Sequence, residues 1–105
     1  MVKKEIRDIV NRFVAALASR GVHVDKALIY GSVAKNMDTS DSDLDVAVVS
    51  SDFGRDRYGE GILLNKVAWR IDARIHPVPI SSDSYNNETW IPLIHEIRTH
   101  GREVA

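Results

Sequence analysis

The feature that most constrains the fold is a short apolar run near the middle of the chain. Residues 44–50, LDVAVVS, are rich in valine and are bounded by turn-forming residues, a pattern typical of a buried β-strand. Such a strand must pair within a sheet and be covered by other elements. The chain has 105 residues, enough for one core of this kind and too few for two. We therefore expect a single domain over residues 1–105.

Other periodic segments predict the partners of this strand. Apolar residues recur at helical spacing over residues 3–20, and residues 24–31 read as a strand. Residues 70–76, RIDARIH, alternate between apolar and polar side chains, as a half-buried strand does. Pro77 and Pro79 should keep this strand from extending deep into a sheet, because proline cannot donate to a ladder.

The rest of the chain supplies further helices and connections. Helices are predicted over residues 61–69 and 90–101, with a loop or helix opening at 52–58 and a polar connection at 81–89. A brief helical turn is predicted at 32–37. The expected fold class is α/β (α+β), a small mixed sheet of about three to five strands with helices packed against it.

Composition excludes several classes of function. The chain has no cysteine, which rules out disulfides, cysteine-ligated zinc and thiol catalysis. No apolar run approaches the roughly 18 residues of a membrane span, and the N-terminus lacks the apolar core of a signal peptide, so we expect a cytoplasmic protein with no membrane partner. The formal charge is −1 and no Lys/Arg run is visible, so nucleic acid is not expected as a partner. A nucleic-acid role would need a local basic patch.

Two aspartates stand at the start of the central strand. Because alternate residues of a strand share a face, Asp43 and Asp45 should point to one side of the sheet and Leu44, Val46 and Val48 to the other. Neighbouring carboxylates repel, which raises the cost of ionising both. A divalent cation removes that cost, and Mg²⁺ prefers such hard oxygen ligands. On its own the pair is also consistent with two solvated aspartates at a strand end.

A glycine–serine turn precedes the two aspartates. Gly31 permits a tight turn and a close backbone approach because it has no Cβ. Ser32 then begins a helical turn whose free N–H groups attract phosphate. A glycine–serine pair also occurs in ordinary strand-to-helix turns, and the chain contains neither a Walker A loop nor a dinucleotide-binding fingerprint. The turn therefore indicates a phosphate site only in combination with the aspartates that follow it.

Taken together, these residues resemble a known signature. The run Gly31-Ser32-x-Ala34-Lys35, followed by Ser42-Asp43-x-Asp45, closely resembles that of the minimal nucleotidyltransferases, small members of the DNA polymerase β-like superfamily. The resemblance implies the polymerase β-like fold, two Mg²⁺ ions and ATP or another nucleoside triphosphate as substrate. It also implies a third carboxylate on a neighbouring strand. The implied catalytic residues and metal ligands are Asp43, Asp45 and Asp72, and the implied phosphate-binding residues are Gly31, Ser32, Lys35 and Ser42.

Several nearby residues admit more than one interpretation. Lys35 is either a phosphate contact or a solvated loop lysine. Arg74 either pairs with Asp72 or contacts substrate, and His76 is expected at the surface or at a partner contact rather than in catalysis. Asn36 stands where relatives commonly carry glycine, and asparagine tolerates a left-handed backbone better than other residues do.

The resemblance implies transfer of AMP from ATP to a hydroxyl group. A chain of 105 residues has no room for an acceptor-binding domain, so the acceptor should come from a partner or a second subunit, and a homo-oligomer is left open. Minimal nucleotidyltransferases are often paired with a helical HEPN-domain protein in toxin–antitoxin modules, which implies a partner tyrosine as acceptor.

Two other function classes share parts of this pattern. The first is a non-catalytic antitoxin or regulatory module that keeps the same fold, although retention of all three carboxylates argues against it. The second, a phosphatase or receiver domain, fits worse, because the paired acids follow the glycine–serine turn in the wrong order.

Overall fold

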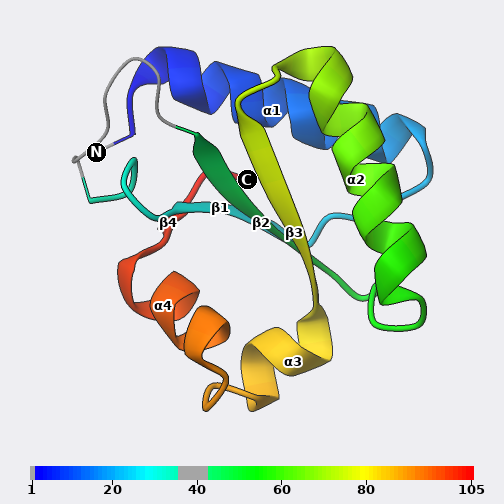
Figure 1. Ribbon diagram of the computed structural model, residues 1–105, viewed down its shortest axis with the longest axis vertical. Coiled ribbons are helices and arrows are strands. Elements are labelled where there is room, and N and C mark those ends of the chain that lie inside the picture. Colours follow the sequence, from blue (N-terminus) through cyan, green and yellow to red (C-terminus); the bar gives the residue numbers. More distant parts are fainter. Residues whose placement is uncertain (1, 36–42) are drawn as a thin grey trace.

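The computed structural model describes residues 2–35 and 43–105, and across these residues it forms one four-stranded sheet in the order β3-β2-β1-β4 (Figure 1). Strand β2 runs antiparallel to β1 and parallel to β3, and β4 is antiparallel to β1. The expected fold class is confirmed. Along the chain the elements are α1 (Lys4–Ser19), β1 (Lys26–Tyr30), β2 (Leu44–Ser50), α2 (Arg57–Ile71), β3 (Ile75–Ser81), α3 (Ser82–Asn87), α4 (Pro92–His100) and β4 (Arg102–Glu103).

Helices cover both faces of the sheet (Figure 1). The helices α1 and α2 pack on one face, where Leu44, Val46 and Val48 of β2 are buried. The helices α3 and α4 pack on the other face, over Ala47 and Val49. Burial on both faces explains why β2 is almost uniformly apolar. The predicted alternation within this strand is confirmed.

The predicted first helix is confirmed, and its end shows how the chain leaves it. Gly21 has a φ of 85°, in the left-handed region that glycine adopts without strain. The Gly21 N–H donates to the Ala18 carbonyl at 3.0 Å, and the Val22 N–H donates to the Leu17 carbonyl at 3.1 Å. These two bonds and the buried Val22 form a Schellman cap.

The strand predicted over residues 70–76 is wrong at both ends. Helix α2 continues through Ile71, and Asp72 is its C-cap residue. Strand β3 begins only at Ile75 and continues to Ser81. The alternation of RIDARIH thus spans a helix end, a turn and a strand start, and its period of two has no single structural origin.

Strand β3 passes through both prolines because it lies at the edge of the sheet. The Leu44 N–H donates to the Arg74 carbonyl at 2.8 Å, so the backbone polar groups of every second residue after Arg74 point toward β2. Those of Pro77 and Pro79 therefore point to the open edge. There the missing N–H groups cost no ladder bond.

Helices α2 and α3 begin at polar caps, whereas Ile91, the N-cap residue of α4, provides no side-chain cap. Helix α2 starts before the predicted segment 61–69, because the Asp56 side chain accepts a hydrogen bond from the Gly59 N–H at 3.1 Å. The predicted polar connection at 81–89 contains α3, which is capped by Ser81 and anchored by the buried Tyr85. Helix α4 lies within the predicted range, with proline at its first turn. Strand β4 was not predicted. No helix among the described residues has the length and apolar character needed to cross a membrane.

Substitution of Phe13 by alanine should test the core between α1 and the sheet. Phe13 is fully buried, so Phe13→Ala is expected to lower the free energy of unfolding by about 3–5 kcal/mol in urea denaturation. Val14→Ala, at the partly buried neighbouring position, serves as the control. Equal losses in the two variants would contradict the assigned helix face.

Candidate active site

The two aspartates of the central strand lie on the face of the sheet that α3 and α4 cover. Asp45 is in β2, opposite Tyr30 of β1 and opposite His76 of β3. Its side chain shares the face of Ala47 and is partly exposed. Asp43 directly precedes the strand and is largely exposed. The pair therefore sits where β2 enters the sheet, with the charged groups open to solvent.

The glycine of the glycine–serine turn lies directly against this pair. Gly31 has a φ of 74°, and a Cβ at this position would clash with Oδ2 of Asp45. The turn that follows is closed by a bond of 3.3 Å from the Lys35 N–H to the Gly31 carbonyl. Val33 and Ala34 anchor the turn in the core. Glycine is thus favoured here by the backbone angle, and a Cβ would in addition displace the Asp45 carboxylate oxygen.

Burial and neighbouring charges act on the ionisable groups of the site. Burial raises the pKa of Asp45, the nearby His76 partly offsets this increase, and the charge of Asp43 adds to it. The pKa of Tyr30 is also raised, first by burial and then by the charge of Asp45. Two carboxylates held on one partly buried face are costly to ionise together. A positive charge placed between them would remove that cost.

His76 is the neighbour that sequence reasoning set aside. Its Nε2 lies 3.3 Å from Oδ1 of Asp43, and its backbone is in register with Asp45. The side chain is 58% exposed, so it borders the same open space as the aspartates. The strand predicted over residues 70–76 included His76, but its register with Asp45 depends on the parallel pairing of β2 with β3, which the sequence does not show.

Asp72, the predicted third carboxylate, has different partners. Its Oδ1 accepts hydrogen bonds from the Arg74 backbone N–H at 2.9 Å and from Nε at 3.1 Å, and its Oδ2 accepts one from Nη2 at 3.0 Å. These bonds lower the pKa of Asp72. Of the alternatives for Arg74, the ion pair is the one observed. The role of Asp72 as a metal ligand stays a prediction. Within residues 2–35 and 43–105, no three His, Asp or Glu side chains are grouped so that they could hold a metal ion.

The predicted phosphate-binding residues divide into three groups. Gly31 and the half-buried Ser32 begin the turn beside Asp45. The Nζ of Lys35 lies 2.9 Å from Oε1 of Glu96 on α4 and lowers the pKa of that carboxyl, so in this structure Lys35 ties the turn to α4. Ser42, like Asn36, lies outside the described residues.

Replacement of Gly31 by alanine should damage both stability and the site. A left-handed alanine costs roughly 1–2 kcal/mol, and the clash with Asp45 adds to this in the free energy of unfolding from urea titration. Gly61→Ala is the matched control, because open space surrounds that helical position and alanine should stabilise α2 by up to about 1 kcal/mol. A neutral Gly31→Ala would contradict the close packing described above.

The ion pair between Asp72 and Arg74 should make stability depend on pH. The folded-state pKa of Asp72 is lowered, so its contribution is fully present above the unfolded value of about 3.9. The contribution is lost as the pH falls through the folded value. Asp72→Asn is expected to cost roughly 1 kcal/mol at neutral pH. The unfolding curves of the two proteins should converge in acid, and a difference that persists to the lowest pH would argue against the pair.

Comparisons with known proteins agree with this fold. A chain in a crystal structure described as "the toxin-antitoxin with AMP-PNP" superposes with a TM-score of 0.59, at 18% sequence identity, over 90% of this chain and 71% of that chain. That similarity shows a shared fold. No curated protein matches the sequence. Residues 13–105 match the family described as "Polymerase beta, Nucleotidyltransferase". Since the match covers most of the sequence, the chain belongs to the polymerase β nucleotidyltransferase family.

Proposed function

We propose that this chain binds a nucleoside triphosphate, ATP in the simplest case, at Asp43 and Asp45 and transfers its AMP moiety to a hydroxyl acceptor. The observation that supports this most strongly is the contact between the Gly31 turn and Oδ2 of Asp45. It brings the turn that begins at Gly31 next to the Asp45 carboxylate. Phosphates are attracted to the backbone N–H groups of such a turn, and a cation held by the carboxylates can bind the same phosphates.

The residues present fit one divalent cation. Asp43 and Asp45 offer oxygen donors on one face, and burial, together with the charge of Asp43, raises the pKa of Asp45. Mg²⁺ bound by one or two carboxylates and completed by substrate phosphates is a common arrangement. When bound, such an ion would neutralise phosphate charge and stabilise the leaving pyrophosphate. Asp43 and Asp45 would hold it.

The neighbouring strand supports one ion rather than the two that the resemblance implies. The residue in register with Asp45 on β3 is His76, which cannot supply a negative charge. Asp72 has both carboxylate oxygens engaged with Arg74 and would support the turn into β3. The site then has two carboxylates, whereas two divalent cations would need a third carboxylate.

The reaction needs little from the protein beyond positioning. The acceptor hydroxyl oxygen attacks the α-phosphorus, the bond to pyrophosphate breaks, and the hydroxyl proton leaves to solvent. The backbone N–H groups of the turn after Gly31, together with the Ser32 hydroxyl, would hold the terminal phosphates. The two aspartates would fix the α-phosphate for in-line attack. Charge neutralisation and alignment account for most of the catalysis in phosphoryl transfer.

We propose a protein as the acceptor. The similar structure described as a toxin–antitoxin complex with AMP-PNP makes a protein partner the first candidate to test. A helical protein of the HEPN type with an accessible tyrosine would supply the hydroxyl group. Asp43 and His76 are both more than half exposed, so a partner side chain can reach the phosphate site from solvent.

One observation favours a second candidate, a non-catalytic binding module. His76 in place of a carboxylate next to the pair leaves a site suited to hold a nucleotide with one cation but less suited to activate a hydroxyl group. In that case the protein would act on its partner by occupancy alone. Incubation of the partner with labelled ATP and Mg²⁺ separates the two candidates, because transfer leaves label on the partner and occupancy does not.

Substitution of Asp45 by asparagine should abolish nucleotide binding and yet stabilise the fold. Calorimetric titration of ATP with Mg²⁺ is expected to show binding to the wild type and none to Asp45→Asn or Asp43→Asn. Thermal unfolding of Asp45→Asn should occur at a higher temperature, because ionisation of this carboxyl is unfavourable in the folded protein. ATP binding that persists in both variants would place the nucleotide elsewhere.

The number of cations is tested by a change at His76. Titration of Mn²⁺, read by its electron paramagnetic resonance signal with ATP present, should give one bound ion per wild-type chain and a second in His76→Asp. His76→Asn is the matched control and should keep one ion, because it removes the imidazole without adding charge. Two ions in the wild type would contradict the single-cation site.

A further inference from the structure

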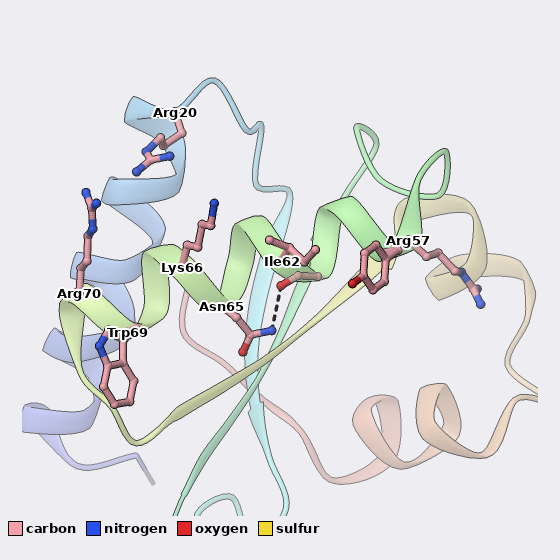
Figure 2. A pocket seen from close by; sticks show the side chains of 9 residues that line it. Arg20, Arg57, Ile62, Asn65, Lys66, Trp69 and Arg70 are labelled. Atoms are coloured by element: carbon pink, nitrogen blue, oxygen red, sulfur yellow. Dashed lines mark hydrogen bonds between the residues drawn. The ribbon is translucent and has the colours of Figure 1, made fainter.

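A groove on the outer side of α2 is separate from the candidate active site. It has a volume of about 1000 Å³ and lies along the exposed face of α2, with Arg20 from the end of α1 at its border (Figure 2). The inner side of α2 packs on the face of the sheet that carries Val46 and Val48. Asp45 points to the opposite face. The groove therefore has to be explained by something other than the phosphate site.

The charge of the groove is entirely positive. Arg20, Arg57, Lys66 and Arg70 line it, and no carboxylate is among its lining residues. Arg20, Lys66 and Arg70 form no salt bridge with any residue in the described ranges, while Arg57 lies near Glu60. Since the whole chain carries a formal charge of −1, these cations are concentrated here. Such a concentration selects an anionic occupant.

Two aromatic side chains stand on the same face. Tyr58 is 81% exposed and Trp69 is 73% exposed, and both lie on α2 at a separation of 11 residues, three helical turns, or about 16 Å. Figure 2 shows Trp69 and Arg57 toward opposite ends of the helix, with Ile62 and Lys66 between them. Rings this exposed contribute little to the core. They are available as flat surfaces for stacking.

The residues between Tyr58 and Trp69 on the exposed face of α2 argue against a partner helix in this groove. A helix–helix seam needs an apolar residue every three or four positions, and here the positions between Ile62 and Trp69 that would continue it are Asn65 and Lys66. Asn65 donates to the Gly61 carbonyl at 2.8 Å and stays with its own helix. Burying the Lys66 ammonium in an apolar seam would be costly. An extended chain that carries its own negative charges would pair with the Lys66 ammonium and would avoid this desolvation cost.

We propose that this groove binds single-stranded nucleic acid. Bases stack on Tyr58 and Trp69, and the phosphates between them lie over Lys66 and the flanking arginines, the combination by which single strands are held without sequence preference. The basic patch that a nucleic-acid role requires is thus formed by side chains of α2 and of the end of α1, which are not consecutive in the sequence. The proposal is independent of the phosphate site and stands whether or not the chain transfers AMP.

The test is fluorescence anisotropy with labelled oligo(dT) and oligo(U) of about 12 nucleotides, a length within the usual site size. Binding should weaken with salt, with a slope of log K against log salt of about −0.7 for each phosphate contacted. Trp69→Ala is expected to weaken binding about tenfold, the loss of one stacked base. Lys66→Glu with Arg70→Glu should weaken it further and flatten the salt slope.

Matched controls come from equally exposed residues outside the groove. Trp90 is 75% exposed and Arg102 lies exposed on β4, so Trp90→Ala and Arg102→Glu should bind the oligonucleotides as the wild type does. Trp69→Ala should also keep its affinity for ATP. Absence of oligonucleotide binding, or equal losses in groove and control variants, would overturn the proposal. So would displacement of the oligonucleotide by an acidic helical peptide that binds the groove more tightly.

Discussion

The contact between Gly31 and Asp45 is the constraint on which the site depends. Strands β1 and β2 pair so that Tyr30 lies opposite Asp45, and the next residue must turn sharply while a carboxylate occupies the space that a Cβ would fill. The burial of β2 on both faces fixes the strand and hence the direction of its aspartates. A partly buried carboxylate with a raised pKa is a cost to stability. Groups that destabilise the fold in this way are typical of functional sites, where a bound ligand offsets the loss of stability.

The elements around this contact could be predicted because their patterns are local. The periodicity of α1, the valine-rich β2 and the glycine–serine turn each carry their own signal within a few residues. The two faces of β2 followed from the alternation of a strand alone. The spacing between Gly31-Ser32 and Asp43-x-Asp45 resembles the signature of the minimal nucleotidyltransferases, and the match of residues 13–105 to the polymerase β nucleotidyltransferase family agrees with that resemblance.

What could not be predicted depends on contacts between distant segments. In the sequence, Pro77 and Pro79 indicate the end of a strand. Only the sheet order shows that β3 is an edge strand, so that the backbone groups of these prolines face no neighbouring strand. The alternation of RIDARIH likewise predicts a strand at Asp72, although Asp72 caps α2 and binds Arg74. The basic groove was equally hidden, since Arg20 and Arg70 come together only when α1 and α2 pack. A sequence shows residue types, whereas the positions of these residues depend on the register between strands, on which strand lies at the edge of the sheet, and on how the helices pack.

The most direct test of the account is the response of the backbone amide signals in a ¹H–¹⁵N nuclear magnetic resonance spectrum to ATP with Mg²⁺. The account predicts that the largest shifts fall on the turn from Gly31 to Lys35 and on Asp43 to Asp45, and that they vanish in Asp45→Asn. Shifts that gather along α2 instead, or that survive the Asp45 substitution, would show that the glycine–serine turn and the paired aspartates are not where this protein holds its nucleotide.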